Sequence, residues 1–288
     1  AKRPFINTGA NSDTLRGSDC KRTMFHTEAQ NVMYVNAEGQ YFLQNDLVKG
    51  KRWFLLSSDY AFGHDLRKGA LAFLERHGGE VAGDELIPTD ATDFSSHLLT
   101  IRSAKPDLIV VNLAGTSNAS FLKQYGEFGL DIPLGGFDYN SSIAWATGAQ
   151  DFKGTWPCVW THQVQTEGSQ AFAKAFMDKY GKPAENQAYS DYIAVRIAAE
   201  AIAKTGGTDT DALVAYLEDP TTEFDILKER FDPATHQLLQ EVYAVTALDP
   251  SEVTNEWDIF KTSAALPAGD IPLEELIKGA VGGACSFS

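Results

Sequence analysis

Short apolar runs alternate with amphipathic helical segments along most of the chain, and this alternation is the feature that most constrains its fold. The stretch Asp107 to Val111 is a nearly continuous apolar run, which is typical of a strand buried on both faces. A turn over 112–116 follows, and then a helix over 117–128 whose apolar residues recur at helical spacing. Gly129 fits the left-handed conformation that ends many helices. A strand, a helix and another strand in this order predict an α/β fold with a parallel sheet.

The same reasoning predicts the other elements. Strands are expected over 52–57, 80–87, 133–137, 223–231 and 238–248. Helices are expected over 64–77, 169–180, 188–204 and 209–217. One more helix should begin at an N-cap of Thr92 or Asp93 and end before Pro106, which cannot continue it. The segment from Thr262 onward is rich in Ala, Pro and Gly, and we expect a loose closing segment.

The charge balance argues against a nucleic-acid partner. The chain has 39 acidic and 24 basic residues, and the basic ones are scattered, whereas nucleic-acid binding needs clustered Lys and Arg. The longest apolar stretches, such as Leu108 to Val111, are far too short to span a bilayer. The three cysteines form no C-x-x-C pair, so a zinc site is not predicted, and their pairing stays open.

No catalytic pattern is present in the sequence. It contains no G-x-S-x-G elbow, H-E-x-x-H, phosphate loop or G-x-G-x-x-G, and the six histidines lack metal-ligand spacing. The carboxylate pairs Asp90 with Asp93 and Glu274 with Glu275 are more typical of helix starts than of an acid/base pair. We therefore expect no enzyme, no metal and no cofactor.

Polar loops follow four of the expected strands, over 7–12, 57–63, 112–117 and 137–141. In an open α/β sheet, ligands bind at the carboxyl ends of the strands, where such loops gather. The loops supply hydroxyl and N–H groups for a carboxylate, Asp138 for a cation, and aromatic rings for an apolar group. They predict a small-ligand pocket. The alternative, that they are ordinary turn and cap residues, stays open.

In order along the chain, several motifs resemble the type I periplasmic binding proteins of the branched-chain amino acid family. Arg3 to Ala10 looks like the family's "vP-hydrophobic-S-P-G-A" strand and turn, and Thr23 to Thr27 like its "FRT" crossing. Asp59 to Gly63 looks like its "D-x-x-Y-G" loop, and Thr92 to Ser95 with Pro106-Asp107 like its "TDFS…PD" helix and strand. The resemblance covers nearly the whole chain.

The resemblance implies two Rossmann-like lobes with parallel, doubly wound sheets, three crossings between them, and a ligand trapped by hinge closure. Lobe one would hold 1–28 and 162–238, and lobe two 29–161 and 239–288. It also implies that the first elements of lobe one are absent from this chain. We expect that absent part to carry an export signal to the periplasm or cell surface.

The resemblance also implies site residues. Gly9, Ala10, Asn11 and Ser12 would bind a carboxylate, and Asp138 would pair with a ligand ammonium. Phe62, beside Tyr60, and Ala114, beside Gly115, stand where the family has tyrosines; Phe137, Tyr139 and Tyr189 would line the pocket. The loss of both tyrosine hydroxyls fits a bulkier or non-amino carboxylate, such as an aromatic acid, at least as well as leucine.

The function implied is the solute-binding subunit of an ABC importer. It would capture a small carboxylate, amino acid or aromatic acid, and deliver it to the permease subunits in the membrane. A monomer is expected. The alternative is a ligand-sensing domain of a receptor or regulator with the same fold.

Overall fold

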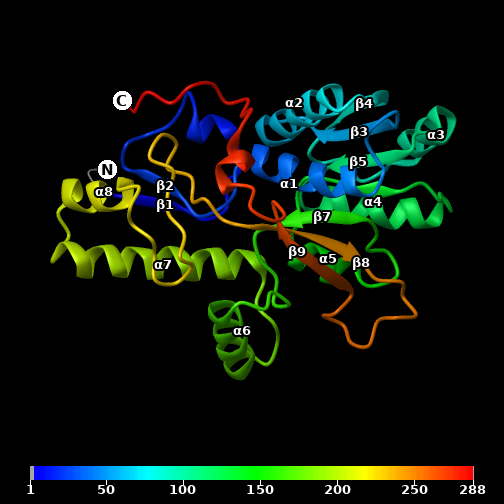
Figure 1. Cartoon of the computed structure of the whole chain (residues 1–288). Helices are drawn as coiled ribbons and strands as arrows, with labels where there is room; N and C mark the ends of the chain where they lie inside the picture. Colours follow the sequence, from blue (N-terminus) through cyan, green and yellow to red (C-terminus); the bar gives the residue numbers. More distant parts are fainter. Residues whose placement is uncertain (1–2, 288) are drawn as a thin grey trace.

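The computed structural model describes residues 3–287, which form a small and a large sheet covered by helices (Figure 1). In the small sheet, β1 (Phe5–Asn7) pairs in parallel with β2 (Met24–His26). The large sheet has the order β4-β3-β5-β6-β7-β8-β9. The two sheets lie at opposite ends of the molecule in Figure 1.

The large sheet is mixed. Its parallel part consists of β3 (Arg52–Ser58), β4 (Glu80–Ile87), β5 (Leu108–Asn112), β6 (Leu134–Gly135) and β7 (Thr155–Cys158). The strands β8 (Val242–Ala247) and β9 (Phe260–Leu266) are antiparallel to their neighbours. The expectation of a wholly parallel sheet is therefore wrong at this edge. The strands β8 and β9 are joined by a loop without a crossover helix, so these two strands run antiparallel to each other. The strand β8 enters the sheet antiparallel to β7 after the chain has passed through α6, α7 and α8.

Each face of the large sheet carries its own core. On one face, α1 (Asn31–Gln44), α2 (Ala61–Arg76) and the 3-10 helix η2 (Leu273–Ile277) cover Trp53 and Leu55 of β3. On the other, α3 (Ser95–Ala104), α4 (Gly115–Glu127) and α5 (Ser141–Thr147) cover Phe54 and Leu56. Successive side chains of a strand point to opposite faces, so a strand buried on both must be apolar throughout.

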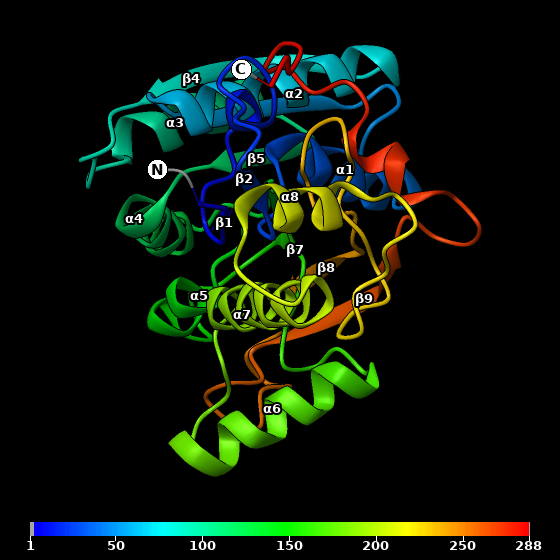
Figure 2. The ribbon, with the colours of Figure 1, turned by 90° about the vertical axis from the view of Figure 1, so that its left-hand side faces the viewer.

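A third core belongs to the small sheet. It contains Phe25, Trp160, Ile193, Phe224 and Phe231. The helices α6 (Glu167–Tyr180), α7 (Asn186–Thr205) and α8 (Thr210–Glu218) surround it, and Figure 2 shows α7 and α8 beside β1 and β2. Within residues 3–287, no helix is long and apolar enough to cross a membrane.

The chain passes three times between the two sheets. Residues 27–30 lead from β2 to α1, residues 159–166 lead from β7 to α6, and residues 239–241 lead into β8. The first and third passages touch, because Gln240 Nε2 donates to the carbonyl of Thr27 at 2.6 Å. The predicted lobe boundaries near these passages stay a prediction.

Some sequence expectations about local structure are wrong. Residues 223–231 form no strand but a turn in which Phe224 N donates to Glu229 O at 2.9 Å, and Phe231 makes only an isolated bridge with Leu238. The expected strand over 133–137 shrinks to β6. The helices α1 and α5 were not predicted. Most residues of α1 are buried, so it lacks the polar face by which amphipathic helices are recognised.

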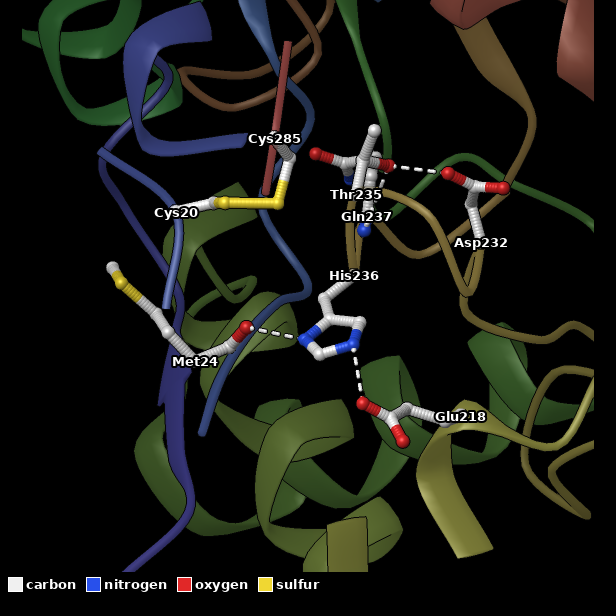
Figure 3. Close-up of a disulfide and its surroundings, with 8 residues drawn as sticks. All are labelled: Cys20, Met24, Glu218, Asp232, Thr235, His236, Gln237 and Cys285. Carbon is white, nitrogen blue, oxygen red and sulfur yellow. Dashed lines mark hydrogen bonds and ion pairs between the residues drawn. A yellow bond between two sulfur atoms is a disulfide. The ribbon is translucent and has the colours of Figure 1, made fainter. Parts of the chain in front are cut away.

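The segment after Thr262 is not loose, which corrects the sequence expectation. It forms β9 and η2 and then returns to the small sheet, where Cys285 is disulfide-bonded to Cys20 (Figure 3). Val281 N donates to Asp13 Oδ2 at 3.0 Å. The ring of His236 is sandwiched between Phe25 and Phe287, with centroids 4.1 Å away on each side. The remaining cysteine, Cys158, is buried and unpaired.

Candidate ligand-binding site

The two parts of the molecule meet where loops leave the carboxyl ends of the strands. Ser12 Oγ, after β1, donates to Asp65 Oδ2 of α2 at 2.6 Å, and Asp13 N donates to the same oxygen at 3.0 Å. At the start of α7, Asn186 Oδ1 accepts from Ser141 Oγ of α5 at 2.7 Å. These contacts join the part around the small sheet to α2, which follows β3, and to α5, which follows β6. The gap between these parts is the position at which α/β sheets bind ligands.

Asp138 is the acidic group of this cleft with no partner. Within residues 3–287 its carboxylate makes no hydrogen bond or ion pair. Burial raises the pKa of Asp138 to about 6. Its side chain nevertheless keeps partial access to solvent, as expected for a group surrounded by protein but open to a cleft. Burial, and then the charge of Asp138, raise the pKa of Tyr60.

A second carboxyl group lies near Asp138 and was missed by the sequence analysis. Glu28 is buried and accepts hydrogen bonds from Asn11 Nδ2, at 3.1 Å, and from the hydroxyl of Tyr34. Burial raises the pKa of Glu28 to about 7; the charge of Asp138 also raises it, whereas the Tyr34 hydrogen bond and Arg16 lower it. The available signal was an acid directly after the crossing motif that ends at Thr27.

Arg16 holds the loop after β1 in place. Its buried guanidinium donates to Ala10 O at 2.6 Å, to Glu28 O at 2.7 Å and to Gln237 Oε1 at 2.9 Å. Burial lowers the pKa of Arg16 to about 10, despite the opposing effect of Glu28 and Asp13. Because these donors are used inside the protein, Arg16 is not a free cation for a ligand.

Hydrogen-bonding groups of the predicted carboxylate loop are partly used by the protein itself. Gly9 and Ala10 are exposed, but their N–H groups donate to Asn7 Oδ1 at 3.4 and 3.0 Å. The side chains of Asn11 and Ser12 are engaged by Glu28 and Asp65. This loop is therefore preorganised by internal bonds, with little hydrogen-bonding capacity left over.

Aromatic surface borders the cleft beside Asp138. The rings of Tyr60 and Phe62 stack with centroids 5.6 Å apart, and 41% of Tyr60 is exposed. Ala114 is half-buried, and its N–H donates to Ser58 Oγ at 3.2 Å. Gly115 opens α4 with a φ of 57°, a left-handed conformation that favours glycine. The rings of Tyr60 and Phe62 therefore place aromatic surface near the charge of Asp138.

Three predicted site residues have their rings buried in the hydrophobic cores. Phe137 is fully buried and packs against Phe42 and Trp53 in the core under α1. Tyr139 is buried against Phe152 and Phe260 on the other face of the sheet. Tyr189 stacks on Trp160 in the core of the small sheet, with centroids 4.5 Å apart. The pocket that contains Asp138 is also lined by Gly115 and Tyr139, and the charge of Asp138 reaches Tyr60. The rings of Phe137 and Tyr189 lie apart from it, in the cores.

Among residues 3–287, no group of three or more His, Cys, Asp or Glu side chains is arranged to hold a metal ion. Cys158 is buried and burial raises the pKa of its thiol, so this cysteine is not an activated nucleophile. The carboxyl groups of Asp138 and Glu28 and the aromatic rings near them are groups that can bind a small ligand.

Comparisons with known proteins agree with this geometry. A curated Leu/Ile/Val-binding protein homolog of Brucella suis is 24% identical over 168 residues, which are 55% of this chain; the match spans 42% of that protein's length. A periplasmic binding protein from Burkholderia mallei is 26% identical, with a TM-score of 0.85 over 99% of this chain and 74% of its own. A branched chain amino acid ABC transporter periplasmic ligand-binding protein from Burkholderia xenovorans is 25% identical, with a TM-score of 0.83 over 96% and 73%.

The family model that matches this chain carries the description "periplasmic binding protein" and covers residues 1–251. That range includes the loop 9–12, the acids Glu28 and Asp138, and all three passages between the sheets. The chain belongs to the periplasmic binding protein family. The solved structures that it resembles at 25–26% identity are named as binding proteins, not as enzymes.

Proposed function

We propose that this chain is the ligand-capturing part of an extracytoplasmic solute-binding protein of an ABC importer. It holds a small ligand that carries an ammonium group, such as an amino acid, in the cleft beside Asp138, and delivers it to membrane permease subunits. The observation that carries the proposal is the carboxyl group of Asp138, which lies in the cleft without a partner among residues 3–287.

The electrostatics of the cleft favour a positive group on the ligand. Asp138 and Glu28 place two carboxyl groups there, and both pKa values are raised because burial disfavours their charges. Arg16, whose charge acts on Glu28, uses its donors on Ala10, Glu28 and Gln237. An ammonium would supply the missing charge through a charge-assisted hydrogen bond to Asp138. A plain carboxylate would add a third negative group.

A second candidate ligand is an aromatic acid without an ammonium. The stacked rings of Tyr60 and Phe62, together with the small Ala114, support an aromatic group in the cleft. Such a ligand would require Asp138 to be protonated, so its binding should strengthen as the pH falls. An ammonium ligand should show the opposite dependence.

The transport role follows the same reasoning. We propose that the two lobes, 1–28 with 162–238 and 29–161 with 239–288, close on the ligand about the three passages. The hydrogen bonds of Ser12 with Asp65 and of Asn186 with Ser141 join the two sides at the cleft and support such closure. Periplasmic or cell-surface location, delivery to a permease and a monomeric state are parts of this proposal.

The test is titration calorimetry with the twenty amino acids and with benzoates, on the chain and on the variant Asp138→Asn. Amino-acid affinity should fall about 100-fold in the variant, the usual effect of losing one charged hydrogen bond. In the unmodified chain it should also weaken about tenfold per pH unit below 6, where Asp138 becomes protonated.

The matched control is Asp131→Asn, which removes the same charge from an exposed position before β6 and should leave affinity unchanged. Equal amino-acid affinity in the chain and in Asp138→Asn would disprove the ammonium role. Binding of benzoates alone, stronger at low pH and in Asp138→Asn, would identify the aromatic-acid candidate instead.

A further inference from the structure

The segment after η2 connects the two parts of the molecule in addition to the three passages. Leu276 of η2 is fully buried in the core of the large sheet beside α1. Further along the chain, Cys285 is disulfide-bonded to Cys20, which lies between β1 and β2. Figure 1 shows this red segment running from η2 toward the end of the molecule that carries β1 and β2. Unlike the passages, the connection is completed by a bond between side chains.

The segment is anchored to the large-sheet part by Asn36 of α1. The side chain of Asn36 is buried, and its Nδ2 donates to the carbonyl oxygens of Leu276 and Lys278, both at 2.9 Å. Lys278 is therefore held against α1 although its own side chain is exposed.

The anchor on the small-sheet side is a run of backbone contacts with the 3-10 helix η1 (Asp13–Arg16) and the residues after it. Val281 N donates to Asp13 Oδ2 at 3.0 Å, and Ser18 N donates to Gly282 O at 2.9 Å. The two backbones lie so close that a Cβ at Gly282 would lie 2.2 Å from Asp13 O. The disulfide then makes this anchor covalent.

Very little chain separates the two anchors. Gly279 and Ala280 alone lie between Lys278 and Val281, both are exposed, and within residues 3–287 neither makes a hydrogen bond. An extended chain spans at most about 3.5 Å per residue, so Lys278 and Val281 can lie no more than about 10–11 Å apart while both anchors hold. If the hydrogen bonds on the small-sheet side break, the disulfide still limits the distance from Lys278 to Cys285 to about 25 Å.

We propose that residues 278–285 form a covalent strap that limits how far the two lobes separate. The inference rests on the hinge closure proposed above. In this structure Ser12 and Asp13 donate to Asp65 of α2, and opening of the lobes would break these hydrogen bonds. Because Asp13 also holds Val281, the movement that separates Asp13 from α2 pulls on the strap. The strap thereby restricts the open conformations and favours the closed ones.

The experiment is small-angle X-ray scattering without added ligand, under non-reducing conditions, on the unmodified chain and two variants. One variant is Cys20→Ser with Cys285→Ser, which removes the cross-link. The other keeps the disulfide but lengthens the strap with Gly-Ser-Gly-Ser inserted between Gly279 and Ala280. A compact chain of 288 residues has a radius of gyration of about 19 Å, and both variants should exceed the unmodified chain by about 1 Å because their lobes open further.

The matched control carries the same insertion between Thr254 and Asn255, in the exposed loop between β8 and β9, and should keep the radius of the unmodified chain. The lengthened strap decides the question if the variant without the cross-link fails to fold. The inference is overturned if the lengthened strap leaves the radius unchanged, or if the control insertion raises it as much. Asp138→Asn should leave the radius of the ligand-free chain unchanged, so failure of the ligand proposal and failure of this one are separable.

Discussion

The disulfide between Cys20 and Cys285 should contribute a large share of the stability of this chain. It joins residues 265 positions apart and so closes nearly the whole chain into one loop. The chain-entropy relation for a loop of this length gives about 5–6 kcal/mol at 25 °C. We treat that value as an upper bound, because engineered and native disulfides commonly deliver about 2–5 kcal/mol. Replacing both cysteines, Cys20→Ser with Cys285→Ser, removes the cross-link without leaving an unpaired thiol.

The contacts around Cys285 indicate which other parts of the structure would be weakened by removal of the disulfide. The segment that carries Cys285 is docked by the hydrogen bond of Val281 N to Asp13 Oδ2 and by that of Ser18 N to Gly282 O, at 2.9 Å. Asp13 Oδ1 in turn accepts from Val32 N at the start of α1. If this segment detached, the buried carboxylate of Asp13 would lose the hydrogen bond from Val281 N. The start of α1, which Asp13 contacts through Val32 N, would be destabilised as well.

The assay is urea unfolding followed by tryptophan fluorescence. With a urea m-value of about 3 kcal/mol per M, the double variant should unfold at a midpoint roughly 1–1.5 M lower. Dithiothreitol should shift the unmodified chain by the same amount and leave the double variant unaffected. A shift below about 0.3 M, or sensitivity of the variant to dithiothreitol, would refute the reasoning.

Two further predictions concern buried carboxyl groups. Burial raises the pKa of Glu28 from 4.5 to about 7, so its ionisation opposes folding as the pH rises through this window. Between pH 4 and pH 8, the free energy of unfolding of the unmodified chain should therefore fall by about 3 kcal/mol relative to that of Glu28→Gln. A difference between the two proteins that does not change with pH would contradict this. Glu38 of α1 is fully buried, and neither of its oxygens has a hydrogen-bond partner among residues 3–287. Glu38→Met should raise the unfolding free energy by about 1–3 kcal/mol, and a lowered thermal midpoint would count against an unpaired carboxyl.

Most elements of the large sheet were predictable because their signals are local. The strand expected over 80–87 is β4 itself, and the helix expected over 169–180 begins two residues earlier, at Glu167. Thr166 caps that helix by accepting from Ser169 N. Hydrophobic periodicity and helix caps are defined within about a dozen residues, so they predict an element without knowledge of the distant parts of the chain.

The failures occur where local signals conflict with burial. Residues 223–231 contain apolar residues that predicted a strand, yet Phe224 and Phe231 reach the core from a turn in which Lys228 has a φ of 60°. The tail after Thr262 contains Ala, Pro and Gly, yet β9 is held by pairing with β8. In both segments the outcome depends on partners that are distant in sequence, which periodicity does not describe.

The sequence by itself determined the α/β alternation and the loops that follow the strands, and it predicted Asp138 as an acid of the ligand site. Only the tertiary structure decided that Cys20 meets Cys285, that Glu28 joins Asp138, and that the rings of Phe137 and Tyr139 enter the cores. Only the tertiary structure, too, brought residues 281–287 to the small sheet, with Gly279 and Ala280 between the two anchors of the strap. The physical reason is that local patterns specify which face of an element is buried, whereas the partner across that face is selected by the packing of the whole chain.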